Sequence, residues 1–257
     1  MDKKEFEFKI VAENPQEAVL VFAKNKEYGK NITLNGDMLY LKNSIYGTNK
    51  KETIFLQKQN CRIVRNCYRK VTKLIKKLKR KKVEFSNIIY IVCNGYEPQS
   101  SNADLLVHML NIKFYGGFFN KLPYVLNKAC EYLDSENSKY KMCDFRDNSC
   151  YKMRELGSKR VTCCCPQSCK FMQAGPCKTK NISCKIIMCD KLEEQGFYFS
   201  PLYNPILAEN LSIFQRLCVY GLFFKSFKST VRVLRLVKFL TYFIIFLIPF
   251  LTILKFI

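Results

Sequence analysis

The sequence ends in a long apolar run that contains no charge. FLTYFIIFLIPFLTIL holds sixteen uncharged residues from Phe239 to Leu254, with a lysine on either side. A bilayer core needs about 20 helical residues, so the run is long enough only if its neighbours join it and the lysines extend to the interface. Pro249 is tolerated in a membrane helix. We therefore predict a transmembrane anchor over residues 236–257, with a buried C-terminal helix as the alternative.

The residues just before this run indicate its orientation. Six basic residues occur there without an intervening acid: Arg216, Lys225, Lys228, Arg232, Arg235 and Lys238. We expect residues 196–235 to form a basic amphipathic juxtamembrane segment. An excess of Lys and Arg marks the cytoplasmic side of a span. The N-terminal MDKKEFEFKIVAENP has no apolar core typical of a secretory signal. The sequence thus predicts a single-pass protein of the cell membrane with its N-terminal bulk in the cytoplasm.

Net charge points to an anionic partner. The chain carries +22 over 257 residues, which favours lipid headgroups or nucleic acid. Residues 61–83 hold eleven Lys and Arg and no acid, while Val64, Cys67, Val71, Leu74, Ile75 and Leu78 recur at helical spacing. This pattern predicts a helix with either a solvated basic face or a footprint on anionic lipid. Nucleic acid is disfavoured because no aromatic RNA motif or recognition helix accompanies the charge.

The N-terminal third mixes strand and helix signals. Residues 5–12 alternate as a strand does, and Asn14, Pro15 and Glu17 then predict a capped helix to about residue 27. The Asn-Gly pair at 35–36 indicates a hairpin turn. ETIFLQ, residues 52–57, is expected to be another strand.

Strands and helices alternate in the next part of the chain. NIIYIVC, residues 87–93, has the composition of a strand buried on both faces of a parallel sheet. A helix from Ser101 to Leu110, a strand over residues 112–117 and a helix over residues 122–133 complete the pattern. Such alternation predicts an α/β domain over residues 1–140, with ligands bound beyond the carboxyl ends of the strands.

The stretch IIYIVCNGYEPQSSNADLLVHMLNIKFYGG resembles the bacterial flavodoxin-like, NAD(P)H-dependent reductase family. The shared features are a Gly and aromatic pair after a buried strand, an Asn that opens the next helix, and a later Gly-Gly: Gly95, Tyr96, Asn102, Gly116 and Gly117. The resemblance implies a flavodoxin-like three-layer fold with FMN bound by Asn94, Gly95, Tyr96 and Asn102. ENPQEA replaces the family's Ser/Thr/Gly-rich phosphate loop after the first strand, so FMN binding stays open.

Seven cysteines lie within the 29 residues from Thr162 to Asp190. In a reducing cytoplasm such density is more typical of metal binding than of disulfides. No C-x2-C hairpin is present, which weakens a structural zinc site, whereas iron–sulfur ligation tolerates irregular spacing. We expect a cysteine-rich metal-binding module over residues 141–195, with an iron–sulfur cluster or zinc held by Cys163, Cys165, Cys169, Cys177, Cys184 and Cys189. Free or disulfide-bonded thiols are the third alternative, and the ligands within the CCC run stay open.

Two functions follow from these expectations. The first is a membrane-anchored electron-transfer protein, an oxidoreductase if it is an enzyme, in which an iron–sulfur cluster and a flavodoxin-like domain exchange electrons with a redox partner protein. The second is a non-enzymatic, membrane-anchored module in which a zinc-held loop presents a binding surface. The single histidine, His108, is expected to be structural, and no hydrolase or Walker motif is present.

Overall fold

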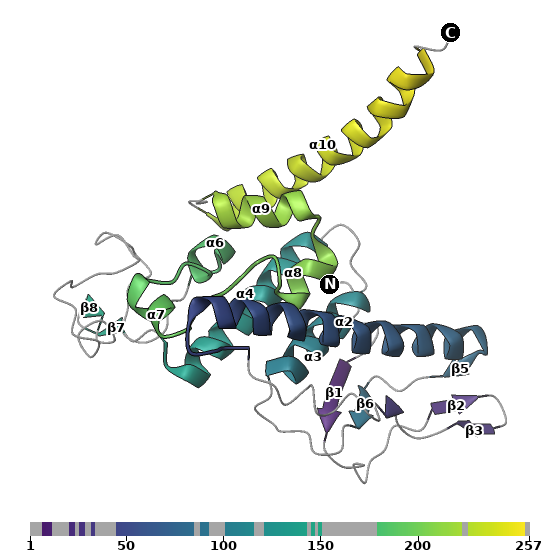
Figure 1. The fold of residues 1–257 in the computed structure, drawn as a ribbon. Coiled ribbons are helices and arrows are strands. Elements are labelled where there is room, and N and C mark those ends of the chain that lie inside the picture. Colours follow the sequence, from purple (N-terminus) through teal and green to yellow (C-terminus); the bar gives the residue numbers. More distant parts are fainter. Residues whose placement is uncertain are drawn as a thin grey trace.

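The structure is a computed structural model. It describes residues 7–11, 21–23, 26–28, 32–33, 45–84, 88–92, 101–115, 121–142, 145–146, 149–150, 179–222 and 226–254. Helices make up most of this part of the chain (Figure 1). Their bounds are α2 (Lys50–Arg80), α3 (Ser101–Lys113), α4 (Lys121–Tyr140), α6 (Ile182–Lys185), α7 (Asp190–Glu194), α8 (Pro205–Asn210), α9 (Ile213–Gly221) and α10 (Phe227–Leu254).

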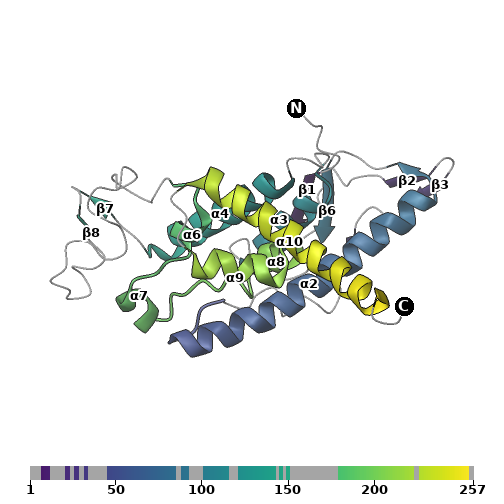
Figure 2. The same ribbon diagram turned by 90° about the horizontal axis from the view of Figure 1, so that it is seen from above.

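The strands are short; two small sheets lie toward one end of the molecule, and a third, two-stranded pairing lies at the opposite end (Figures 1 and 2). In the first sheet, β6 (Ile88–Val92) pairs in parallel with β1 (Glu7–Val11) and with β4 (Ile32–Thr33). In the second sheet, β2 (Val21–Ala23) pairs antiparallel with β3 (Lys26–Tyr28) and β5 (Val83–Glu84). A third, two-stranded pairing joins β7 (Phe145–Arg146) to β8 (Ser149–Cys150).

The core forms where helices pack on one another. Large side chains of α3 and α4 are fully buried, among them Leu106, Leu110, Leu126 and Tyr132. α2 runs along the length of the molecule against α3, and α8 fills the space between α2 and α4 (Figures 1 and 2). α9 and α10 lie over this layer, and α10 then projects away from it. The chain is therefore organised around helix–helix contacts.

This arrangement corrects the predicted fold class. A flavodoxin-like three-layer domain places helices on both faces of a large parallel sheet. Within the described residues, the parallel sheet has only β1, β6 and the two-residue β4, and the helices bury their apolar faces against each other. The α/β prediction for residues 1–140 is wrong because a local alternation of strand and helix signals does not fix how many strands assemble.

Several predicted elements are confirmed and others are wrong. The strands near residues 5–12 and 87–93 and the helices starting near 101 and 122 are present as β1, β6, α3 and α4. The strand predicted over residues 52–57 is part of α2, and the one predicted over 112–117 begins inside α3. The helix predicted to reach residue 27 gives way to β2 and β3. The turn at residues 35–36 lies outside the described residues.

The C-terminal prediction is corrected as well. α10 is a 28-residue helix whose first half packs on the body through Thr230, Val231 and Leu234. Across the part of the chain that the structure describes, no helix has the length and apolar content needed to cross a membrane. The predicted transmembrane anchor over residues 236–257 is therefore wrong, and so is the single-pass placement in the cell membrane that depended on it.

Candidate functional site: a basic face on a long helix

α2 separates its charged and buried residues on opposite faces. A helix advances about 100° per residue, and eight exposed Lys and Arg fall within an arc of about 100° on one side. We call these residues the basic stripe: Lys51, Lys58, Arg62, Arg69, Lys73, Lys76, Lys77 and Arg80. The opposite side is buried and includes Val64, Cys67, Val71 and Ile75. The stripe extends for about 43 Å at 1.5 Å per residue.

The charges of the basic stripe are not neutralised by their surroundings. None of its eight side chains forms an ion pair with another described residue. Glu52, the one acid of α2, lies at the start of the helix and accepts hydrogen bonds from the backbone N–H and hydroxyl of Thr48. These bonds lower the pKa of Glu52, so it stays ionised near the helix N-terminus. The rest of the exposed face is therefore a row of uncompensated positive charge.

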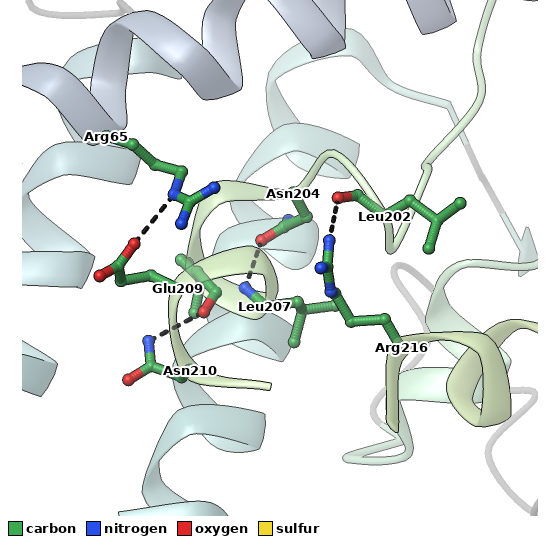
Figure 3. Close-up of polar contacts among 8 residues, drawn as sticks. Arg65, Leu202, Asn204, Leu207, Glu209, Asn210 and Arg216 are labelled. Atoms are coloured by element: carbon green, nitrogen blue, oxygen red, sulfur yellow. Dashed lines mark hydrogen bonds and ion pairs between the residues drawn. The ribbon is translucent and has the colours of Figure 1, made fainter. Parts of the chain in front are cut away.

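Two other basic residues of α2 do have acidic partners and fix the helix in place. Lys50 Nζ lies 2.6 Å from Glu193 Oε2 of α7. Arg65 Nε lies 2.9 Å from Glu209 Oε2 of α8 (Figure 3). Both pairs sit beside the stripe and join α2 to segments more than 140 residues away. Lys50 and Arg65 thus stabilise the fold, whereas the eight cations of the basic stripe can contact a partner.

The buried face of α2 is also held by hydrogen bonds to the backbone of residues 196–200. Thr53 Oγ1 donates to Gly196 O at 2.6 Å, and Gln57 donates to Tyr198 O while its Oε1 accepts from Ser200 N at 3.0 Å. Buried polar groups that find partners in this way specify one register between two segments. α2 is therefore fixed against rotation, and its basic stripe keeps a constant outward direction.

A close backbone approach at Gly196 makes this attachment possible. Gly196 has a φ of 85°, which favours glycine. A Cβ added there would meet Gly47 O at 2.0 Å. The segment that leads into α2 and the segment after α7 thus pack backbone against backbone.

α8 connects the basic helix to α9. Asn204 caps α8 by accepting a hydrogen bond from Leu207 N at 3.2 Å, and Pro205 occupies the first helical position. Arg216 of α9 reaches back and donates to Leu202 O at 2.6 Å, as Figure 3 shows. Together with the Arg65–Glu209 ion pair, these contacts tie α2, α8 and α9 into one unit.

α9 exposes an apolar face. Its start is set by a reciprocal capping box between Ser212 and Gln215. Ile213, Phe214, Leu217 and Tyr220 share one side of the helix and are 46%, 57%, 46% and 57% exposed. We call these four residues the apolar face. α10 also exposes large apolar side chains between residues 236 and 247, among them Phe239, Phe243 and Ile245.

The predicted flavin residues do not form a described site. Asn94, Gly95 and Tyr96 lie outside the described residues. Asn102 is fully buried in the first turn of α3, where its Nδ2 donates to Asn60 Oδ1 of α2 at 3.1 Å. Asn102 therefore joins two helices of the core.

A cavity beside Asn60 is also too small for a flavin. It measures about 20 Å³ and is lined by residues that include Gln57, Asn60, Tyr132 and Phe199. This volume holds about one water molecule.

The predicted metal ligands are only partly described. Cys163, Cys165, Cys169 and Cys177 lie outside the described residues. Cys184 is half-buried in α6, and Cys189 is buried in the hydrophobic core at the position before α7. No group of three His, Cys, Asp or Glu within the described ranges is arranged to hold a metal ion. Cys189 packs there among core side chains, and the predicted metal site as a whole stays a prediction because four of its six ligands lie outside the described residues.

His108, expected to be structural, lies among helix contacts. It is half-buried on α3 and meets Tyr132 edge to face, with ring centroids 6.3 Å apart. Burial, together with the nearby charge of Lys128, lowers its pKa to about 4. The imidazole is therefore neutral at physiological pH.

Sequence reasoning found the basic residues of α2 but missed what holds them. The periodic apolar positions correctly placed Val64, Cys67, Val71 and Ile75 inside, whereas Leu74 is 37% exposed. The polar anchors Thr53 and Gln57 were missed because they fell in the segment predicted as a strand. Their helical spacing of four and three residues, continuing through Asn60 to Val64, was the available signal.

Comparison with known proteins adds no relative. No protein-family model matches the sequence, and no curated protein or solved structure is significantly similar to it.

Proposed function

We propose that the protein binds peripherally to anionic phospholipid surfaces through the basic stripe of α2. The observation that carries this proposal is the row of eight exposed, unneutralised Lys and Arg on one face of a 31-residue helix. Each basic residue near an anionic membrane surface contributes about 1 kcal/mol. Eight such residues offer ample attraction even if several stay solvated.

The form of the stripe favours a planar array of headgroups. The charges follow one side of a helix for about 43 Å, and the helix is fixed against rotation by Thr53, Gln57 and Arg65. A flat surface with many laterally mobile phosphates and carboxylates can match such a row without a defined register. The proposal needs no helix that crosses the bilayer.

Nucleic acid is the competing polyanion. Base recognition or stacking would require aromatic or amide side chains among the cations. Along the outward side of α2, Phe55 is the one exposed aromatic among the described residues, and the exposed amides Gln59 and Asn66 share that side. All three precede residues 69–80, where the charge is densest. This distribution supports lipid headgroups over bases.

The redox hypothesis stays an untested prediction without a supporting observation. It joined a flavodoxin-like domain to an iron–sulfur cluster, and the fold does not supply that domain. The lipid proposal depends only on described residues.

Vesicle sedimentation tests the proposal. The protein should bind vesicles of phosphatidylcholine with 30 mol% phosphatidylserine, a composition chosen on the order of an anionic leaflet, and not vesicles of phosphatidylcholine alone. Binding should weaken steeply as salt screens the charges. The triple variant Arg69→Glu, Lys73→Glu, Lys76→Glu should lose affinity by about 100-fold or more, because at least three favourable contacts are removed.

A matched control separates the stripe from net charge. Lys141, Lys180 and Lys191 are exposed and lie outside α2, so reversing these three changes the total charge equally. This control variant should keep most of its vesicle affinity. Equal losses in both variants would contradict the proposal, as would tight binding to a DNA duplex with no binding to vesicles.

A further inference from the structure

α9 combines rigid anchoring with outward apolar exposure. Its inner side buries Val219 and Gln215, and Gln215 Nε2 donates to Leu234 O of α10 at 2.8 Å. Arg216 is held by its hydrogen bond to Leu202 O. The helix therefore cannot turn the apolar face inward without breaking these contacts.

Exposure of the apolar face is costly in water. Burying a Phe or Leu side chain is worth about 1.5–3 kcal/mol. Phe214 and Leu217 each leave roughly half of their surface uncovered. Four such residues on one side of a nine-residue helix are typical of helices that lie in a membrane interface or against a partner protein.

The charge around α9 decides between these occupants. No Asp or Glu follows Glu209 in the sequence, whereas Arg216, Lys228, Arg232, Arg235 and Lys238 all do. A second copy docked through the same surface would bring two sets of cations together. An anionic lipid surface neutralises them instead.

We infer that the apolar face of α9 inserts into the boundary between headgroups and acyl chains of an anionic bilayer. Phe214 and Leu217 enter the apolar layer, and the exposed Arg232 and Arg235 of α10 contact the headgroups. This inference rests on the proposed function, and it adds a hydrophobic, salt-resistant contact to the electrostatic one made by α2.

Tryptophan fluorescence gives a direct test because the chain contains no tryptophan. Phe214→Trp places a single reporter on the apolar face, and Ile187→Trp places one at a 39% exposed site between α6 and α7. With phosphatidylserine-containing vesicles, emission from the reporter at position 214 should shift to shorter wavelength. Lipids brominated along the acyl chains should quench it. Emission from the control reporter should change in neither respect.

A second variant measures the contribution to affinity. Phe214→Ser with Leu217→Ser should weaken vesicle partitioning by about tenfold or more. The salt dependence should keep its slope, because no charge is removed.

The outcomes separate the two proposals. If vesicles bind the protein but emission at position 214 does not change, the inference about α9 is wrong and the proposed function stands. If vesicles do not bind, the proposed function fails, and the inference fails with it. A blue shift that grows with protein concentration in the absence of vesicles would identify a second copy as the occupant and overturn the inference.

Discussion

The outward faces of α2 and α9 are both exposed, yet they differ in what exposure costs them. The basic stripe of α2 is well solvated and contributes a field that acts over about a Debye length, some 8 Å at physiological salt. The apolar face of α9 gains free energy only when water is removed from it. One face therefore favours encounter with an anionic surface at a distance, and the other favours close contact.

The inward faces differ too. α2 is attached through many contacts, including Thr53, Gln57, the Asn60–Asn102 pair and two ion pairs. α10 is joined to α9 by the Gln215–Leu234 hydrogen bond and packs through a few side chains of its first half. We expect damage at α2 to spread through the core, and damage at α9 to stay local.

The largest expected effect is at the attachment of α2. Gly196→Ala should lower the free energy of unfolding by about 3 kcal/mol, because φ is positive there and the new methyl group would clash with Gly47 O. Urea unfolding measures this loss. Gly221→Ala at the end of α9 is the matched control, since a Cβ there meets nothing within 4 Å. Equal losses in the two variants would remove the distinction between the regions.

Acidification should act on the core beneath α2, where α3 carries His108, and not on α9, which has no acid or histidine. The pKa of His108 is about 4 when folded, below its ordinary value of 6.5. Between these values the unfolded chain binds the extra proton, so stability falls as pH drops from 6.5 toward 4. We expect a loss of about 2 kcal/mol for this half-buried group.

The variant His108→Gln tests that assignment through urea unfolding at several pH values. Burial raises the pKa of Asp104, which opposes the histidine by favouring the folded state in acid. The difference between the wild type and the variant isolates the histidine. An identical pH dependence in both proteins would show that His108 does not titrate as proposed.

A smaller and more local effect is expected at Gln215. Gln215→Ala removes the bond to Leu234 O and half of the capping box, and it should cost about 1–2 kcal/mol. Hydrogen exchange should speed up in α9 and the first half of α10 and stay unchanged in α2. Faster exchange throughout α2 would mean that the two regions unfold together.

The elements that the sequence predicted well are those whose neighbours along the chain settle their structure. β6 is a continuous run of strand formers, and α4 has regular apolar spacing. ETIFLQ was assigned to a strand because six residues were considered alone, whereas Thr53 and Gln57 continue the periodicity of α2. Local pattern was sufficient where it was considered over enough residues.

Tertiary organisation was harder to predict because it depends on pairings between distant residues. The order of β1, β6 and β4 and the docking of α2 on residues 196–200 join segments that no local pattern connects. The basic stripe could be inferred in part from residues 61–83. The full length of the stripe, the ion pairs of Lys50 and Arg65 beside it, and the exposure of the apolar face of α9 could be seen only in the folded structure.

The core thiols also determine how the folded protein withstands reactive chemicals. Burial raises the pKa of Cys61 to about 11 and that of Cys130 to about 12. At neutral pH these thiols therefore stay protonated, whereas peroxides and alkylating agents attack the thiolate. The sulfur atoms pack here as small apolar groups between helices, and we expect these buried thiols to react slowly with oxidants.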